Sequence, residues 1–401
     1  MKKILIIILI FFSVVLFGEE FNISESNLPG SPNVVFIDTK GEYVSLSLFV
    51  KFGENQPGLA HLCEHLAFGT NSKMKNGDLD YICESMGATC DAYTNYDYSV
   101  YKIVVKRNYL PQILENLSYA LLTPTPRENE LKIEKKIIKD ELSGREGVTF
   151  DFVRYTLQRT LYGDTYYGIP IEGDDISQIP LEDVQSFYNN NYIPKNVSII
   201  IAGEVDKEKI LQCIKTYFPP SPKNSFNIPI DTKLEGENLV ISGSKNYFGI
   251  MFNMAPSIFT REAVACDVVS QLVDLLSNRS IKEKYKYKST YIHNTGKWAS
   301  PFSLVYEGED TEFVKEEILK ATEKVKIGDF TEYDLQDAKN IILSDYLGKN
   351  TQIQNVTYNV GFNYVMYDFD TAVTYDQLIK KVSKPDIMTM ANKYLATYST
   401  V

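Results

Sequence analysis

The feature that most limits how this chain can fold is a weak internal repeat in the order of its predicted strands and helices. Apolar and polar residues alternate from Val44 to Phe52, a pattern typical of a strand with one buried face, and segments of helical period follow. A strand-like run over 246–254 begins a similar order again. With 401 residues the chain is long enough for two cores, so we predict an α+β protein with two similar domains.

Composition separates the two predicted domains. The stretch 218–238 is rich in Pro, Asn and Ser and has no apolar period, which is typical of a linker. We therefore expect a first domain over 19–220, a linker over 221–237 and a second domain over 238–401. The second copy of the repeat ends at Val401, where the first copy enters its last strand, so this strand is expected to be missing.

Residues 1–18 have the build of a secretory signal peptide. Two lysines precede an apolar run from Ile4 to Phe17, and Gly18 is a small residue at the expected cleavage site. We therefore expect export to the periplasm or the extracellular space. The alternative is an uncleaved membrane anchor, although the apolar run is short for a full span. Association with a membrane is expected only in that case.

Charge and cysteine content argue against other classes of protein. The net charge of −11 disfavours nucleic-acid binding, which needs a basic surface. The five cysteines are too few and too scattered for a disulfide framework, and none forms a CxxC pair. Cys83 and Cys90 are close enough in sequence to form a disulfide, but two buried thiols are the favoured interpretation.

The segment His61-Leu-Cys-Glu64-His65 contains two of the three histidines of the chain. On a helix that turns about 100° per residue, both imidazoles and the carboxylate of Glu64 lie on one side. Two such imidazoles can bind zinc, and a catalytic zinc keeps one position open for water, whose proton Glu64 can accept. Cys63 projects elsewhere and is expected in the core. The alternative is a histidine pair without a metal, but shuffled sequences of this composition contain the pattern only roughly once in a thousand trials.

A third zinc ligand has to come from another part of the chain. The predicted helix over 127–145 offers Glu141, and Glu134 lies two turns earlier on the same face. The isoleucines of this helix are expected to mark its buried stripe, with both glutamates at the edge of the stripe; they are Ile133, Ile137 and Ile138. The alternative is that both glutamates belong to an ordinary solvated face.

The segment GLAHLCEHLAFGT resembles the pitrilysin/insulinase family of zinc metallopeptidases, the inverzincins, which includes the mitochondrial processing peptidase. The likeness continues through LYGDTYYGIPIEGDDISQI and is fainter in the second half. It implies that each domain is a mainly antiparallel sheet covered by helices. It also implies that His61, His65 and Glu141 bind one zinc ion per chain. By the same resemblance, Glu64 is the general base and Glu134 supports the site.

Two departures from the family pattern bear on substrate and partners. The family's substrate-lining Asn-Ala-x-Thr is here Asp91-Ala92-Tyr93-Thr94, which implies that Asp91, Ala92 and Thr94 contact the peptide. An arginine and a tyrosine of the family's second domain have no clear match, and the arginine position resembles Ser303. Half-length relatives work as pairs, so the resemblance implies a dimer. A heterodimer in which this chain holds the zinc is favoured over a homodimer.

These inferences predict an exported zinc endopeptidase that hydrolyses peptide bonds in unfolded peptides laid along an edge strand of the first domain. The rival hypothesis is a non-catalytic peptide-binding or assembly subunit of a peptidase heterodimer. The remaining histidine, His293, is expected to be structural because it lies in a strand-like run near Tyr291.

Overall fold

A computed structural model describes most of the chain. The described residues are 10–16, 19–52, 58–143, 149–163, 165, 167–173, 175–221, 237–240, 245–254, 262–284, 288–293, 296, 300–349 and 352–401. They form two compact units, each assembled from three stretches of sequence: 1–140, 171–228 and 347–373 in the first, and 141–170, 229–346 and 374–401 in the second. Most of the predicted linker, residues 222–236, lies outside the described residues, as do residues 1–9 and 17–18 of the predicted signal peptide.

The first unit is built on a seven-stranded sheet. Neighbouring strands are antiparallel except β3 and β7, which are parallel. In spatial order the strands are β1 (Ile10–Leu16), β2 (Glu19–Ser26), β3 (Asn33–Ile37), β7 (Val197–Ala202), β4 (Tyr43–Lys51), β6 (Tyr98–Lys106) and β5 (Thr89–Thr94). The strand β5 therefore lies at one end of the sheet.

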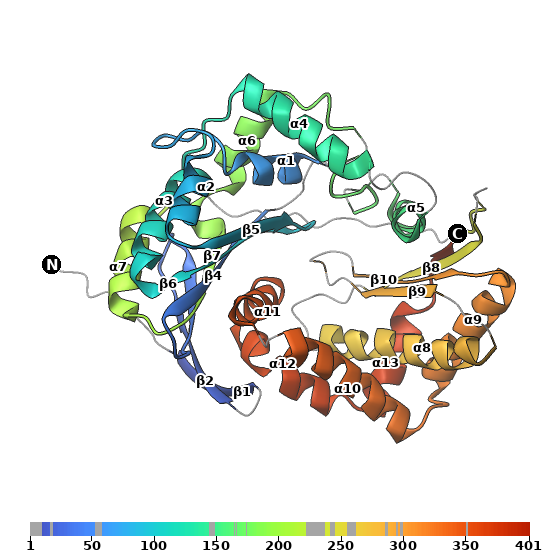
Figure 1. The fold of residues 1–401 in the computed structure, drawn as a ribbon. Helices are drawn as coiled ribbons and strands as arrows, with labels where there is room; N and C mark the ends of the chain where they lie inside the picture. Colours follow the sequence, from blue (N-terminus) through green and yellow to red (C-terminus); the bar gives the residue numbers. More distant parts are fainter. Residues whose placement is uncertain are drawn as a thin grey trace. The chain divides into compact units, whose positions relative to one another are not determined.

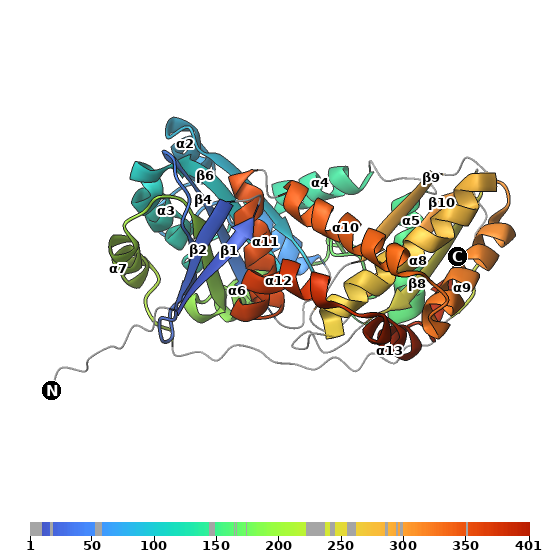
Figure 2. The ribbon, with the colours of Figure 1, turned by 90° about the horizontal axis from the view of Figure 1, so that it is seen from below.

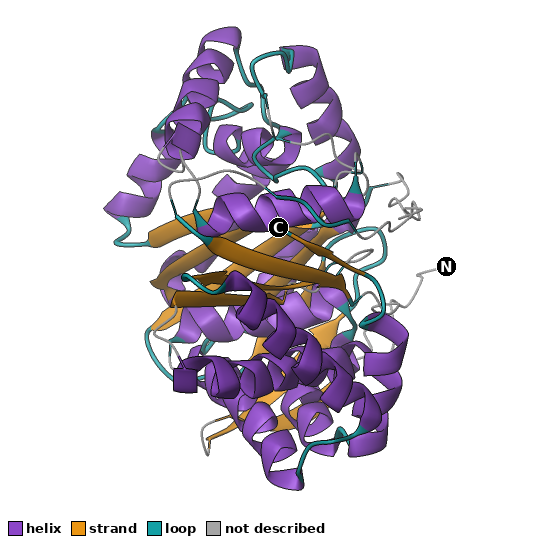
Figure 3. Ribbon diagram, turned by 90° about the vertical axis from the view of Figure 1, so that its right-hand side faces the viewer, coloured by secondary structure: helices purple, strands orange, loops and turns teal. Residues whose placement is uncertain are grey.

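Helices cover both faces of this sheet (Figure 1, Figure 3). On one face α1 contacts α6 and α3 contacts α7, while α11 lies on the other face against β4 and β7. The helices of the unit are α1 (Leu59–Leu66), α2 (Asp78–Ser85), α3 (Leu110–Leu122), α4 (Glu128–Ser143), α6 (Leu181–Asn191), α7 (Lys207–Tyr217) and α11 (Ile353–Met366), with short 3-10 helices η1 (Arg107–Tyr109) and η2 (Pro194–Asn196).

The strand β4 differs from its prediction. Its alternating sequence predicts one buried face, but the side chains of residues 44–50 are buried on both faces. The helix α11, from the far end of the sequence, covers the serine face. Ser45 and Ser47 hydrogen-bond there with Thr357, at 2.8 and 2.9 Å between hydroxyl oxygens. The serines are buried because a distant helix supplies their partner.

The second unit repeats part of this plan. Its four-stranded antiparallel sheet has the order β11 (Tyr398–Thr400), β8 (Tyr247–Asn253), β10 (Pro301–Glu307) and β9 (Lys288–His293). This order matches β7-β4-β6-β5 of the first unit, so the internal repeat is confirmed. The expectation that the last strand is missing is wrong: β11 occupies that place, and its three residues are too few to show a strand pattern in the sequence.

Helices α8, α9 and α13 pack on one another beside this sheet (Figure 2). The remaining helices are α5 (Phe150–Tyr162), α8 (Glu262–Lys284), α9 (Thr311–Ile327), α10 (Glu332–Lys349), α12 (Phe369–Lys381) and α13 (Lys384–Tyr394). Within the described part of the chain, no helix combines the length and the apolar character needed to cross a bilayer.

The two halves of the sequence exchange one helix each. The helix α5, from the first half, packs on β8 and β10 of the second unit, and α11, from the second half, packs on β4 and β7 of the first. Glycines allow both close approaches. A Cβ at Gly361 of α11 would lie 2.3 Å from Cε2 of Phe49, and one at Gly249 of β8 would lie 2.7 Å from side-chain carbons of Val153 and Leu157.

Candidate metal centre

The helix α1 begins at a glycine that no other residue could replace without strain. Gly58 has a φ of +80°, and a Cβ there would lie 2.4 Å from Cγ2 of Ile176. Its N–H donates to the carbonyl oxygen of Ile171 at 3.0 Å. This left-handed conformation and close approach fix where α1 starts, and with it the positions of His61 and His65.

One face of α1 is apolar and buried, and the opposite side carries both histidines. The buried apolar residues are Leu59, Ala60, Leu62, Cys63 and Leu66. Cys63 lies in the core as predicted, and burial raises the pKa of its thiol well above the usual value. The rings of His61 and His65 are half-buried, with centroids 4.8 Å apart and planes at 88°. Both imidazoles thus lie on one side of the helix.

The helix α4 is held in place at two points. Near its start, Glu130 accepts hydrogen bonds from the hydroxyl of Thr70 and from the N–H of Arg127. In its middle, Lys135 Nζ donates to the carbonyl oxygens of Ser177 and Ile179, at 2.8 and 2.6 Å. These contacts fix α4 to the segments that follow α1 and precede α6.

The buried stripe of α4 differs from the prediction. Leu131 and Ile138, seven residues apart, are 3% and 0% exposed, whereas Ile133 and Ile137 are 51% and 41% exposed. At about 100° per residue, positions 131 and 138 nearly coincide in direction, and 133 and 137 lie about 100° or more away from them. The expectation that all three isoleucines are buried is therefore wrong.

The structure brings His61, His65 and Glu141 together: one ligand atom from each lies within 4.8 Å of the other two. Ligand atoms on a tetrahedral zinc, bound at about 2.0–2.2 Å, are about 3.3 Å apart, so small side-chain rotations would close the group on one ion. Glu141 is exposed and lies on the last turn of α4, which is continuous from Glu128. Two nitrogens and one carboxylate oxygen form a donor set that suits a catalytic zinc with an open position.

Glu134 lies beside His65, with its Oε2 3.1 Å from Nδ1 of the ring. A carboxylate at this distance accepts the Nδ1 proton, which fixes the tautomer and makes Nε2 the ring nitrogen that can bind a metal. Glu134 thus takes a supporting place next to a ligand.

Glu64 is buried, 8% exposed, and its carboxylate points toward the histidines and β5. Its Oε2 lies 3.9 Å from Nε2 of His61 and 3.4 Å from the hydroxyl of Thr94. A carboxylate next to an open metal position can accept a proton from a water molecule bound there.

The three predicted substrate residues lie on β5 but on different faces of it. Asp91 is exposed and forms an ion pair with Lys102 Nζ at 2.5 Å. Ala92 and Thr94 alternate with it, and Thr94 faces Glu64. The structure therefore groups Thr94 with the motif and places the side chain of Asp91 on the opposite face.

Sequence reasoning missed Ser99, which pairs with Thr94 across the β5–β6 hairpin. Its hydroxyl oxygen lies 2.9 Å from that of Thr94. The spacing of the two strand patterns contained a signal, since the three-residue loop between Thr94 and Tyr98 pairs Thr94 with Ser99. The same reasoning missed Glu130 and Lys135, whose partners are distant in sequence.

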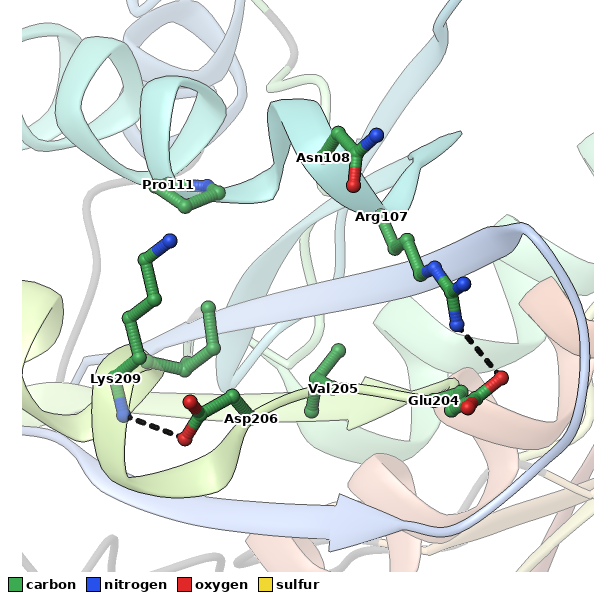
Figure 4. A pocket seen from close by; sticks show the side chains of 8 residues that line it. Arg107, Asn108, Pro111, Glu204, Val205, Asp206 and Lys209 are labelled. Atoms are coloured by element: carbon green, nitrogen blue, oxygen red, sulfur yellow. Dashed lines mark hydrogen bonds and ion pairs between the residues drawn. The ribbon is translucent and has the colours of Figure 1, made fainter.

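A pocket of about 590 Å³ lies in the first unit, away from these residues (Figure 4). It adjoins the end of β6, whereas Ser99 lies at the start of this strand, about 26 Å away at about 3.3 Å per residue. Among its charged residues, Arg107 pairs with Glu204 at 2.7 Å and Asp206 accepts from the backbone N–H of Lys209 at 3.1 Å. The pocket and the histidine motif are separate features.

The sequence also pointed to two residues of the second unit, Ser303 and His293. Ser303 is buried on β10. His293 has a side chain only 5% exposed, and its Nδ1 lies 3.0 Å from Oδ1 of Asp267, which also accepts from the hydroxyl of Tyr375. This environment agrees with a structural role for His293.

Two family models match consecutive parts of the chain. Residues 33–175 match "Insulinase (Peptidase family M16)", and residues 178–342 match "Peptidase M16 inactive domain". The first match contains the proposed metal ligands and their neighbours, which are His61, Glu64, His65, Glu134 and Glu141. The second contains Ser303 and His293.

Individual relatives agree with these matches. A protein named zinc protease PqqE from Helicobacter pylori is 23% identical, over 89% of this chain and 86% of its own length. The beta subunit of mitochondrial-processing peptidase from Saccharomyces cerevisiae is also 23% identical, over 92% and 89%. The crystal structure of a protease from Helicobacter pylori superposes with a TM-score of 0.84 at 22% identity, covering 94% of this chain and 98% of that one.

Proposed function

Because the chain belongs to the insulinase (M16) family of peptidases, we propose that it is a zinc-dependent endopeptidase that hydrolyses peptide bonds in unfolded peptides. One observation carries this proposal: one ligand atom from each of His61, His65 and Glu141 lies within 4.8 Å of the other two, and the buried carboxylate of Glu64 lies beside them. Relatives over most of the chain are named zinc proteases or processing peptidases.

The residues of the chain would have three roles in the reaction: metal ligand, general base and support of a ligand. When bound by His61, His65 and Glu141, zinc supplies a Lewis acid that polarises the scissile carbonyl and lowers the pKa of water. Glu64 accepts a proton from the attacking water as the new C–O bond forms, and delivers it to the leaving nitrogen as the C–N bond breaks. Glu134 holds the ring of His65 in one tautomer throughout.

The substrate would bind in extended form along β5. This strand lies at the end of the sheet order, so the backbone groups on its outer side can pair with a peptide. Peptide binding through backbone groups selects for unfolded chains and tolerates many side chains. Asp91, next to Lys102, would then affect which side chains are accepted at that position.

The proposal is tested with a quenched fluorescent peptide, with and without a chelator, on wild-type protein and on Glu64→Gln. Wild-type protein should cleave the peptide, and the chelator should stop cleavage. The E64Q variant should contain as much zinc as wild type and show at least a hundredfold lower turnover, because general-base catalysis typically contributes about 10²–10⁴-fold. Cleavage by E64Q at the wild-type rate would exclude Glu64 as the base.

A second candidate is a non-catalytic peptide-binding or assembly subunit. Ser303 at the family's arginine position favours this candidate, as does the match of residues 178–342 to a family model described as inactive. One relative is itself named as a subunit, and we propose that this chain works as a dimer, with a related half-length partner or with a second copy. Metal-dependent cleavage by the chain alone argues against the non-catalytic candidate, and cleavage only after mixing with a companion chain supports a heterodimer.

We propose that the protein is exported and that residues 1–18 are removed. The support is the sequence of the segment: two lysines, an apolar run and Gly18. Cleavage after Gly18 would remove β1 and leave β2 as the end of the sheet. The mass of the mature protein tests this proposal, and a mass that includes residues 1–18 favours the uncleaved membrane anchor.

A further inference from the structure

We propose that Thr94 and Ser99 are positioning residues that hold the carboxylate of Glu64 through a one-way series of buried hydroxyl groups, so that Thr94 acts on the base and not on the peptide. The effect on turnover rests on the proposed peptidase function. The arrangement itself rests on contacts within the first unit.

The contacts run from Glu64 into the core of the unit. The hydroxyl of Thr94 lies 3.4 Å from Oε2 of Glu64 and 2.9 Å from the hydroxyl of Ser99. Glu64, Thr94 and Ser99 are 8%, 9% and 0% exposed, so these hydrogen bonds are largely shielded from bulk solvent. Thr94 and Ser99 are directly paired residues of β5 and β6, which places both side chains on the same face of the sheet.

The direction of each hydrogen bond follows from proton counting. A carboxylate that serves as a base is ionised and can only accept, so Thr94 donates to Glu64. A threonine hydroxyl has one proton, and Thr94 therefore accepts from Ser99. Ser99 thus gives its own proton to Thr94 and is the first donor of the series.

Two buried tyrosines of the same unit also pair through their hydroxyl groups, with the oxygens of Tyr192 and Tyr101 2.9 Å apart. Burial, together with the nearby carboxylate of Glu64, raises the pKa of both tyrosines well above the usual value, so both stay protonated.

The aligned hydroxyl dipoles of Ser99 and Thr94 strengthen one another and both point toward the carboxylate. They restrict the side chain of Glu64 to one orientation. Loss of the Thr94 hydroxyl removes the last donor of the series from a buried carboxylate. The expected consequence is a lower rate of the chemical step with unchanged substrate affinity.

The test compares Thr94→Val, which keeps the shape and loses the hydroxyl, with Thr94→Ser, which keeps the hydroxyl. T94V should lower kcat about tenfold with KM and zinc content unchanged, and T94S should stay within twofold of wild type. Thr357→Val is the matched control, because Thr357 is also buried and hydrogen-bonded but faces Ser45 and Ser47. T357V should lower the unfolding midpoint without lowering kcat.

A second measurement does not depend on activity. In metal-free protein, the effects of T94V and E64Q on the unfolding equilibrium constant should be non-additive by at least fivefold, whereas those of T357V and E64Q should multiply independently. Independent effects of T94V and E64Q would overturn the inference, as would a kcat for T94V within twofold of wild type or a change confined to KM. If wild-type protein shows no chelator-sensitive cleavage, the proposed function fails, and the double-mutant cycle still decides whether Thr94 holds Glu64.

Discussion

Nδ1 of His65 lies 3.1 Å from Oε2 of Glu134, so one ring nitrogen of this imidazole contacts a carboxylate and the other, Nε2, is the one that can bind a metal. The charge of Glu134 orients the ring of His65 and makes it a stronger ligand. Replacing Glu134 by Gln removes this charge. We expect zinc affinity to fall about 10- to 100-fold, as is usual for the partners of zinc-binding histidines. Competition with a fluorescent zinc chelator measures the change.

Glu128→Gln is the control for this prediction, because Glu128 is exposed at the start of the same helix. It should bind zinc as wild type does. Equal affinities for E134Q and wild type would show that the contact between Glu134 and His65 has no effect on the metal.

Gly58 is predicted to be intolerant of any side chain. Alanine there combines a positive φ, which costs about 1–2 kcal/mol, with a clash against Ile176, and overpacking of this kind costs about 1–3 kcal/mol. We expect G58A to lower the free energy of unfolding by about 2–5 kcal/mol, measured by urea denaturation. Gly77 has a φ of +84°, and a Cβ there would meet no atom of the described residues within 4 Å, so G77A should show only the smaller, conformational cost. Equal losses in both variants would contradict the steric account.

The exchange of helices between the two halves of the sequence predicts whether two further substitutions raise or lower the free energy of unfolding. Alanine in place of glycine in the interior of a helix or strand normally stabilises it by roughly 0.5–1 kcal/mol. At Gly361 the added Cβ meets Phe49, and at Gly249 it meets α5, so we expect G361A and G249A each to destabilise by about 1–3 kcal/mol. A stabilised G361A would mean that α11 does not lie against β4.

Asp274, on α8, should make stability depend on pH. Burial raises the pKa of its carboxyl to about 6, above the usual 3.8, although Lys282 and hydrogen bonds from Asn278 and Gln271 act in the opposite direction. The folded protein therefore binds this proton more tightly than the unfolded chain does. The contribution of Asp274 to the free energy of unfolding should then fall as pH rises from about 4 to 6, by up to about 3 kcal/mol.

The measurement compares unfolding of wild type and Asp274→Asn at pH 4.5 and pH 7.5. The free energy of unfolding of wild type minus that of D274N should be smaller at pH 7.5 than at pH 4.5. A difference between the two proteins that is the same at both pH values would show that Asp274 has an ordinary pKa.

Local patterns predicted the parts of the fold that depend on neighbours in sequence. The helical period alone places His61 and His65 on one side of α1. It also places Glu134 and Glu141 on one side of α4. The repeat of strand order was visible for the same reason, because each copy has its own strand and helix patterns.

Burial by distant elements was not predictable in this way. The serines of β4 have the pattern of a solvent-facing strand face, and only the arrival of α11 makes them buried. Ile133 and Ile137 are apolar and yet exposed, so an apolar residue on α4 does not by itself mark the buried stripe. The three residues of β11 gain their strand conformation by pairing with β8, not from a pattern of their own.

The central claim is that Glu141, from α4, completes a zinc site with His61 and His65 of α1. Its most direct test is the zinc content of Glu141→Gln after dialysis against a weak chelator, measured by mass spectrometry of the metal, with Asp140→Asn as the neighbouring control. We predict about one zinc per chain for wild type and D140N and almost none for E141Q. Full zinc occupancy in E141Q would contradict the account, because the third ligand would then lie elsewhere.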